Sequence, residues 1–353
     1  MESIITTSYA VHFNDVAYSA LNGHLAKARY SKLFVLVDEN THDHCLPKFM
    51  SEINGDYDFE IIEIEAGEDH KNIATCTQVW EVLSELGADR KSVMINLGGG
   101  VITDLGGFVA SAFKRGIDFI NVPTTLLSMV DASIGGKTGV DLGALKNQIG
   151  VFSQPVMVLV VTDFLKTLAD RQMQSGFAEM LKHGLIRDRD YWNRLKAFND
   201  FDAIAPLIYE SVGIKNEVVL QDPTEQNLRK ILNYGHTLGH AVESYFLEST
   251  THQPLLHGEA IAVGMVLEAW LSHQLHGLSA ADLNDIKDTF LGRYQKVSFS
   301  EQDIEGIKTF LKFDKKNSHG NVNFVLLKTI GEAVVDVQID DNLLQQSFSY
   351  YSE

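Results

Sequence analysis

The stretch that says most about the architecture of this chain is SVMINLGGGVITD, residues 92–104. Its first, mostly apolar half predicts a buried strand, and the glycines at 98–100 lead from that strand into a helix. A turn of this kind presents the backbone N–H groups of the helix start, which can receive a phosphate. The motif is not a full G-x-G-x-x-G fingerprint, so a plain steric turn and a dinucleotide site both stay open.

Strand and helix signals alternate on both sides of this stretch. Strands are predicted at residues 32–37, 59–65, 92–97, 119–122 and 156–161, with a helix at 72–86. Beyond residues 162–170 the pattern becomes helical, at 171–186, 203–220, 228–246, 258–276 and 280–291, with one strand at 321–327. We therefore expect an α/β Rossmann-like nucleotide-binding domain at residues 1–168 and a mostly α-helical metal-binding domain at residues 169–353. The site is expected in the cleft between them.

Charge and composition limit the classes of partner. The chain carries 47 Asp and Glu against 29 Lys and Arg, a formal net charge of −18, which argues against nucleic acid or an anionic membrane. An anionic metabolite stays possible, because charges beyond a Debye length of about 8 Å are largely screened. The longest apolar runs, 156–161 and 260–267, are too short to cross a bilayer. No signal peptide is recognisable, and Cys45 and Cys76 give no disulfide framework, so we expect a cytoplasmic protein.

Three short segments carry the residue types that ligate a catalytic zinc. They contain Glu179, the pair His236 and His240, and His257. One Glu and two His would supply three protein ligands and leave a position for substrate. A metal and a dinucleotide in one chain together suggest redox chemistry on a hydroxyl that the metal polarises.

Each of these residues also has a simpler interpretation. Glu179 could pair with Lys182 instead of a metal, and His257 could cap the helix that follows it. The two histidines at i and i+4 resemble a zinc-protease helix, but Thr237 stands where that motif has its general base. Gly235 and Gly239 indicate close backbone approach at this helix or tight helix packing.

Residues 115–147 form the densest polar stretch. Its Gly-Gly-Lys-Thr segment at 135–138 resembles the end of a P-loop, but Asp131 occupies the position of the first P-loop glycine, so that motif fails. Lys137, Lys146 and Asn147 still indicate an anion cradle. Upstream, Asp38 could receive ribose hydroxyls, and Glu68 and Lys71 could hold the other end of the nucleotide. These last three could equally be solvated loop charges.

Taken together, these segments resemble the 3-dehydroquinate synthase family. The match is carried by residues 98–104, 122–127, 131–139, 146–147, 176–182, 233–240 and 256–259, within a resemblance that covers about residues 30–330. It implies an NAD-binding domain, a helical zinc domain and a homodimer. It also implies conversion of 3-deoxy-D-arabino-heptulosonate 7-phosphate into 3-dehydroquinate and phosphate in the shikimate pathway.

The resemblance also implies a role for individual residues. Zinc, for which cobalt can substitute, would be held by Glu179, His236 and His257, while His240 would contact the substrate. Further substrate contacts would be Lys137, Lys146, Asn147, Lys182, Lys215, Arg229, Asn233 and Lys315, with Arg115 reaching into the partner subunit's site. The NAD side would comprise Asp38, Glu68, Lys71, Gly99, Gly100, Asp104, Thr124, Thr125, Asp131, Lys146 and Thr167.

The implied reaction explains why these residue types are needed. Hydride leaves the C5 hydroxyl for NAD, the ketone acidifies C6–H, phosphate is eliminated, and the hydride then returns before ring opening and aldol closure. Two rival enzymes stay open. The substrate of another sugar-phosphate cyclase would have no carboxylate, so that enzyme would not need Arg229 and Lys215. A metal-dependent polyol dehydrogenase would release NADH and would not need Lys137, Lys146 and Lys315. A non-catalytic NAD-binding regulator would not need a complete set of metal ligands.

Overall fold

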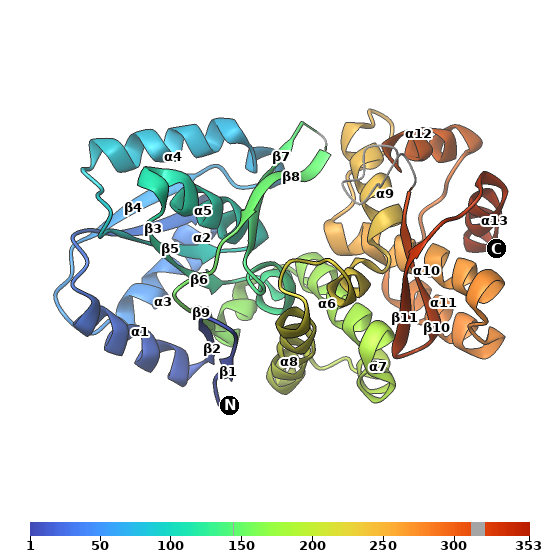
Figure 1. The fold of residues 1–353 in the computed structure, drawn as a ribbon, viewed down its shortest axis with the longest axis horizontal. Coiled ribbons are helices and arrows are strands. Elements are labelled where there is room, and N and C mark those ends of the chain that lie inside the picture. The colour runs from blue at the N-terminus through green and yellow to red at the C-terminus, as the bar shows by residue number, and fades with distance from the viewer. Residues whose placement is uncertain (144, 312–321) are drawn as a thin grey trace. The chain divides into compact units, whose positions relative to one another are not determined.

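The computed structural model describes residues 1–143, 145–311 and 322–353 (Figure 1). Lys315 and the first residue of the strand predicted at 321–327 lie outside the described residues. The chain forms two compact units. The first comprises Met1–Gly143, Asn147–Met173 and Ala203–Leu220, and the second comprises the short piece that holds Lys146, Gln174–Asp202 and Gln221–Glu353.

A seven-stranded sheet forms the centre of the first unit, in the order β1-β2-β9-β6-β5-β3-β4. Its strands are β1 Ile4–Ile5, β2 Ala10–Phe13, β3 Leu33–Asp38, β4 Phe59–Ile64, β5 Val93–Gly98, β6 Asp118–Pro123 and β9 Val158–Val160. In the described residues β1 pairs antiparallel with β2, and the other neighbours pair in parallel. Every residue of β5 is buried, as expected for a strand covered on both faces. The predicted α/β fold with a mostly parallel sheet is confirmed.

Helices cover both faces of this sheet. Figure 1 shows α4 (Ile73–Glu85) and α5 (Gly100–Ala112) on one side, and α1 (Asp15–Ala28) and α3 (Leu46–Ser51) on the other. The core under α4 and α5 is built from alternate strand residues and the apolar faces of the two helices. At Gly106, a Cβ would lie 2.1 Å from the Asn96 side-chain oxygen, so α5 lies directly on β5.

The strand order reverses between β3 and β5. From β3 the chain continues to β4 on one side, and then crosses to β5 on the other side of β3. In doubly wound sheets, ligands bind beyond the carboxyl ends of the strands at such a reversal. Asp38 ends β3 and Gly98 ends β5. The fold therefore places Asp38 and the glycine turn after β5 at the edge where such sheets bind ligands.

The remaining elements of the first unit are short or lie outside the sheet. They are α2 Glu39–His44, η1 Glu68–His70, η2 Phe113–Arg115, η3 Ser128–Ala132, the hairpin strands β7 Lys137–Leu142 and β8 Leu145–Phe152, η4 Thr162–Thr167 and α8 Ala205–Gln221.

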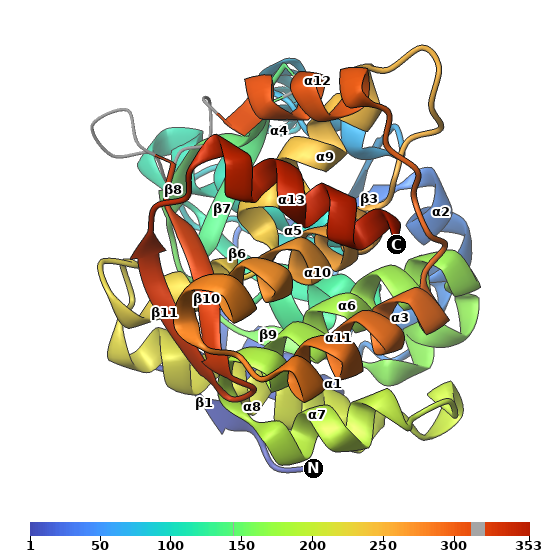
Figure 2. The ribbon, with the colours of Figure 1, turned by 90° about the vertical axis from the view of Figure 1, so that its right-hand side faces the viewer.

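The second unit is mostly helical, as predicted. Its elements are α6 Asp170–Arg187, α7 Arg189–Lys196, η5 Phe201–Ala203, η6 Leu228–Asn233, α9 His236–Glu248, α10 His257–His276, α11 Ala280–Arg293, α12 Glu301–Leu311, β10 Phe324–Thr329, β11 Glu332–Val337 and α13 Asp341–Ser352. Helix α10 packs against α9, α11, α13 and β10 (Figure 2). This surrounding explains why α10 is apolar on all sides.

One prediction about the second unit was wrong, and another was incomplete. The single helix expected at 228–246 is divided into η6 and α9, because Gly235 has a left-handed backbone (φ 78°) that an α-helix cannot include. The single strand expected near 321–327 is one half of a hairpin, since Gly331 (φ 98°) turns the chain from β10 into β11. Within the described part of the chain, no helix is both long and apolar enough to cross a membrane.

Candidate functional site

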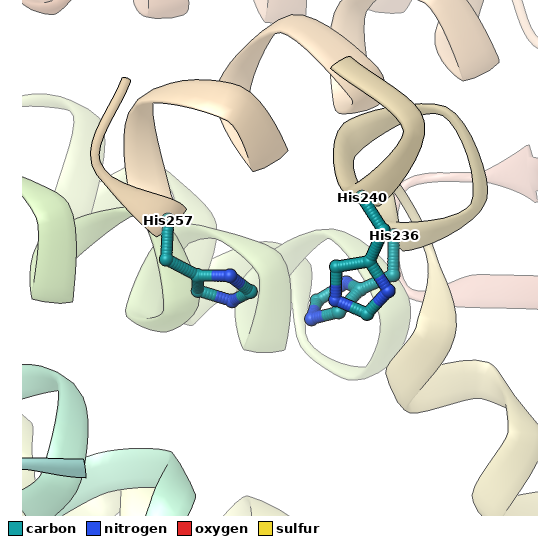
Figure 3. A group of neighbouring side chains, drawn as sticks. All are labelled: His236, His240 and His257. Atoms are coloured by element: carbon teal, nitrogen blue, oxygen red, sulfur yellow. The ribbon is translucent and has the colours of Figure 1, made fainter. Parts of the chain in front are cut away.

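Two helices of the second unit bring three histidines together. His236 and His240 lie one turn apart at the start of α9, and His257 is the first residue of α10 (Figure 3). One ring nitrogen of each lies within 4.8 Å of the others. The ring centroids are 5.1, 5.5 and 5.6 Å apart. These separations suit imidazoles that face one small ion.

A carboxylate from a third helix completes this cluster. Glu179 of α6 is fully buried, and its Oε1 lies 3.5 Å from Nε2 of His236 and 3.5 Å from Nε2 of His257. Its other oxygen, Oε2, forms an ion pair with Lys182, which is also buried. The two interpretations of Glu179 are therefore compatible, because one oxygen faces the histidines while the other faces the lysine.

The hydrogen bonds of the two imidazoles determine which nitrogen faces Glu179. Nδ1 of His236 lies 3.1 Å from the Tyr234 carbonyl oxygen, and Nδ1 of His257 lies 3.1 Å from Glu243 Oε2. Both oxygens accept, so each Nδ1 donates. In the neutral form of each ring, Nε2 then carries a lone pair directed towards Glu179 Oε1. Three donor atoms of the type that zinc prefers thus surround one point.

The charge state of His257 fits a site for a cation. Burial lowers the pKa of its imidazole, but the carboxylates of Glu243 and Glu179 outweigh this effect and raise the pKa to about 10. A divalent cation bound here would replace the positive charge that the proton supplies, and binding would release that proton.

His257 does not cap the helix that it begins. The N–H of Leu256 is instead bonded to Glu259 Oε2 at 2.7 Å, and the N–H of Gly258 donates to Ser175 Oγ at 2.9 Å. The capping interpretation of His257 was therefore wrong. Its side chain is available for the metal cluster because Glu259 and Ser175 close the helix start.

Glycines allow the helices that carry these ligands to approach closely. A Cβ on Gly258 would lie 1.9 Å from the Ser175 carbonyl oxygen of α6, and a Cβ on Gly264 would lie 2.0 Å from the Gly235 carbonyl oxygen. A Cβ on Gly239 would lie 2.6 Å from the Ile261 side chain. The close backbone approach predicted from Gly235 and Gly239 is confirmed.

The other predicted substrate residues of the second unit lie on η6 and β8. Arg229 is buried and donates to the Pro223 carbonyl at 2.6 Å, while Asn233 Nδ2 donates to Glu225 Oε1 at 2.8 Å. Lys146 Nζ lies 3.6 Å from Glu243 Oε1. The cations are thus held by local acceptors in defined positions.

Lys71, Asp104 and Asn147 meet in the first unit. Lys71 Nζ donates to Asp104 Oδ2 at 2.7 Å and to Asn147 Oδ1 at 2.8 Å, and Lys71 is buried. Burial alone lowers the pKa of Lys71, but the carboxylates of Asp104 and Glu68 more than offset this and raise it. The interpretation of Lys71 as a solvated loop charge was wrong. Asn147 holds this position with a left-handed backbone (φ 51°).

A second buried lysine of this unit meets a predicted nucleotide residue. Lys215 of α8 donates to the Asp131 carbonyl oxygen at 2.6 Å and to its Oδ1 at 2.7 Å. Asp131 lies in η3, a π-helical turn, a feature that occurs often at functional sites. Lys137 begins β7 and is half-buried, and Arg115 ends η2 and is exposed.

The other predicted NAD residues lie near the carboxyl ends of the parallel strands or at element ends. Asp38 is the N-cap of α2 and accepts from Thr41 N at 2.8 Å, so it is not a free loop charge. The glycines form the start of α5, and the N–H of Thr124 donates to the Gly98 carbonyl at 3.0 Å. The remaining members and their elements are Gly99 (N-cap of α5), Gly100 (first residue of α5), Thr125 (after β6), Glu68 (η1) and Thr167 (end of η4).

Two buried carboxylates at this site were missed in the sequence. Glu243 lies seven residues after His236 on the same face of α9, a spacing that identifies it once the metal helix is recognised. Glu268 is buried in the apolar helix α10 and accepts from the N–H of Gly235 at 2.6 Å. Glu268 can be recognised only from the packing of α10 on α9.

Solved structures define the class of this fold, which is that of the sugar-phosphate cyclases. ValA (2-epi-5-epi-valiolone synthase) from Streptomyces hygroscopicus subsp. jinggangensis, solved with NAD+ and Zn2+, is 26% identical, with a TM-score of 0.86 over 100% of this chain and 99% of that chain. A 2-deoxy-scyllo-inosose synthase solved with carbaglucose-6-phosphate, NAD+ and Co2+ is 23% identical, with a TM-score of 0.85 over 99% of each chain. A probable glycerol dehydrogenase from Sinorhizobium meliloti shares the fold more distantly, at a TM-score of 0.60, 14% identity, and coverage of 97% and 95%.

Sequence relatives narrow this class to one family. Residues 61–175 match the family model "3-dehydroquinate synthase N-terminal", and residues 176–317 match "3-dehydroquinate synthase C-terminal". The 3-dehydroquinate synthase of Parabacteroides distasonis is 40% identical over 95% of both chains. That of Campylobacter concisus is 39% identical over 96% of this chain and 95% of its own. The chain belongs to the 3-dehydroquinate synthase family.

Proposed function

We propose that this chain converts 3-deoxy-D-arabino-heptulosonate 7-phosphate into 3-dehydroquinate and phosphate. It would act as a carbon–oxygen lyase of the shikimate pathway, which leads to the aromatic amino acids. The observation that carries the proposal is the placement of Glu179 Oε1 at 3.5 Å from Nε2 of both His236 and His257. Such a three-donor site, in a chain of this family, suits an enzyme that polarises a substrate hydroxyl.

Glu179, His236 and His257 would hold the metal, zinc or cobalt. When bound, the ion lowers the pKa of a hydroxyl that it contacts, which assists loss of hydride to NAD. The fit rests on the donor types and on the two Nδ1 hydrogen bonds, which leave each Nε2 facing the carboxylate. His240 lies beside this set and would orient the substrate.

The buried cations would bind the two anionic groups of the substrate. In the second unit these are Lys146, Lys182 and Arg229, each less than a tenth exposed. The resemblance also predicts substrate contacts at Lys137, Lys215 and Lys315, and at the neutral side chains of Asn147 and Asn233. Cations clustered in one site of an otherwise acidic protein are suited to bind the phosphate and carboxylate groups of a substrate.

NAD would bind in the domain predicted at residues 1–168, at the edge formed by β3 and β5. The reversal of strand order there, with Asp38 at one strand end and Gly99 and Gly100 at the start of α5, supports this placement. The Lys71–Asp104 pair would fix the nearby polar groups. The helical domain predicted at residues 169–353 would bind the metal and provide many of the substrate contacts. We further expect the enzyme to work in the cytoplasm.

The experiment that tests this function is an assay of phosphate release from the heptulosonate phosphate, with NAD and a divalent metal present. We expect release from this substrate and none from a hexose phosphate, which lacks the carboxylate. Release from the hexose phosphate alone would indicate another sugar-phosphate cyclase.

We also propose a homodimer in which Arg115 reaches the partner subunit's site. Arg115 and its neighbour Lys114 are exposed and both have left-handed backbones, at φ 72° and 48°. Non-glycine residues in this region are strained and cluster at functional sites. Such a turn at the surface is consistent with an arginine that works outside its own subunit.

Arg115→Ala should weaken substrate use roughly 10- to 150-fold, because a hydrogen bond to a charged group contributes about 1.5–3 kcal/mol. Zinc and NAD binding should stay intact. Mixed with inactive His236→Ala, it should recover up to about a quarter of wild-type activity, since each heterodimer rebuilds one complete site. Steady-state kinetics before and after subunit exchange provide the measurement. No recovery after verified exchange would place Arg115 in its own subunit's site or outside any site.

A further inference from the structure

Glu243 connects two parts of the candidate site. It is a residue of α9, only 6% exposed, and lies on the helix face that carries His236 and His240. Its Oε2 lies 3.1 Å from His257 Nδ1, and its Oε1 lies 3.6 Å from Lys146 Nζ. A buried carboxylate is costly unless it is paired, and here each oxygen has a positively charged or hydrogen-bond-donating neighbour.

We propose that Glu243 is the positioning residue that fixes His257 as an Nε2 metal ligand. This assignment rests on the proposed function, because it requires a metal at Glu179, His236 and His257. An imidazole can rotate about its side-chain bond and present either nitrogen, so one hydrogen bond must select between them. The bond from Nδ1 to Glu243 selects the orientation in which Nε2 faces Glu179.

The comparison with His236 supports this assignment. The Nδ1 atom of His236 donates to a backbone carbonyl, that of Tyr234, at 3.1 Å, which a side-chain substitution cannot remove. His257 begins a helix and has a carboxylate in the same role. A carboxylate acceptor makes an imidazole a more basic and more firmly oriented ligand, and such outer partners typically change metal affinity 10- to 100-fold.

Lys146 gives Glu243 a second task. The ammonium group of Lys146 lies beside Oε1 and the imidazole of His257 lies beside Oε2, so one carboxylate can accept from His257 while it pairs with Lys146. Because one carboxylate serves both groups, the substrate-binding lysine and the metal ligand are coupled through a single side chain.

The test compares Glu243→Gln with Glu248→Gln, the same substitution on an exposed residue of the same helix. Zinc dissociation constants are measured by competition with a chelator, and the ligand field is followed by the visible absorption of the cobalt-loaded protein. We expect Glu243→Gln to bind zinc about 10- to 100-fold more weakly and to shift the cobalt bands. Glu248→Gln should match wild type in both. The unfolding midpoints of the metal-free proteins show whether the variant is folded.

The outcomes separate this assignment from the proposed function. A wild-type protein that binds zinc, with a Glu243→Gln variant that binds it as tightly and with the same cobalt spectrum, would overturn the assignment alone. A wild-type protein that binds no zinc would overturn the proposed function and this assignment with it. If Glu243→Gln does not fold, histidine nitrogen NMR of zinc-loaded wild type decides. His257 must then show a protonated Nδ1 and a metal-bound Nε2, and the reverse pattern contradicts the proposal.

Discussion

His236→Ala removes bound zinc and activity together: this is the largest effect that we expect of a single substitution. His236 Nε2 is one of the two imidazole nitrogens that face Glu179 Oε1 at 3.5 Å, so its loss leaves two ligands. A catalytic zinc takes three protein ligands, and the two that are left would not hold it. Elemental analysis of the purified variant gives the zinc content, and phosphate release gives the activity.

His240→Ala is the matched comparison, because its ring belongs to the same cluster. It should retain zinc and lose activity, since we assign it to the substrate. His240 is close enough to be a ligand itself. The other two histidines are favoured by their Nδ1 hydrogen bonds, which turn each Nε2 towards Glu179. Zinc retained in His236→Ala but lost in His240→Ala would show that the assignment of the two is reversed.

Gly264→Ala should lower the free energy of unfolding of the helical unit more than any substitution of an exposed residue. The new Cβ would lie 2.0 Å from the Gly235 carbonyl oxygen and 2.7 Å from the Gly239 nitrogen, and both atoms are backbone. Overpacking costs about 1–3 kcal/mol and occasionally more. We expect the top of that range, about 3 kcal/mol, because neither contact can be relieved by a side-chain rotation. The start of α9 must move, so zinc affinity should fall as well.

Gly292→Ala provides the control in the same unit. Gly292 is an exposed residue of α11, and a Cβ there would meet nothing within 4 Å. Alanine has the higher helix propensity, so stability should rise by up to about 1 kcal/mol. Urea unfolding of both metal-free variants, followed by circular dichroism, measures the difference. Equal stability of the two variants would mean that α9 and α10 do not approach as closely as described.

The sheet could be predicted from the sequence because buried parallel strands are continuous apolar runs. Residues 32–37 and 92–97 became β3 and β5 with shifts of a single residue. The short strands β1 and β2 and the hairpin of β7 and β8 were not predicted, since they are short or polar and depend on their neighbours. The domain boundary at 168/169 stays a prediction.

The helical unit shows where sequence patterns fail. The apolar spacing of residues 228–246 continues through Gly235, and only tertiary contacts reveal the break. Glu268 accepts the Gly235 N–H from another helix, a contact that no local pattern encodes. Similarly, Glu243 acquires its role from His257, fourteen residues along the chain and on a different helix.

The candidate site was predictable as a set of residue types but not as a set of contacts. Glu179 and the histidines were identified from helix spacing and from the resemblance to the family. Their side chains do converge, although their roles stay predictions. From the sequence, Lys71 and Asp38 could each be a solvated charge or a binding residue. The structure gives each a hydrogen-bond partner, Asp104 for Lys71 and Thr41 for Asp38. Such pairings depend on loops whose course no periodicity indicates.

The most direct measurement of the central claim follows phosphate and NADH in one reaction with the heptulosonate phosphate, NAD and a divalent metal. Because hydride leaves and returns within each turnover, phosphate should appear in step with product while NADH stays flat. The Arg115→Ala and His236→Ala proteins, assayed singly, should slow or stop phosphate release without raising NADH. Steady accumulation of NADH in proportion to turnover would contradict the account and identify a dehydrogenase.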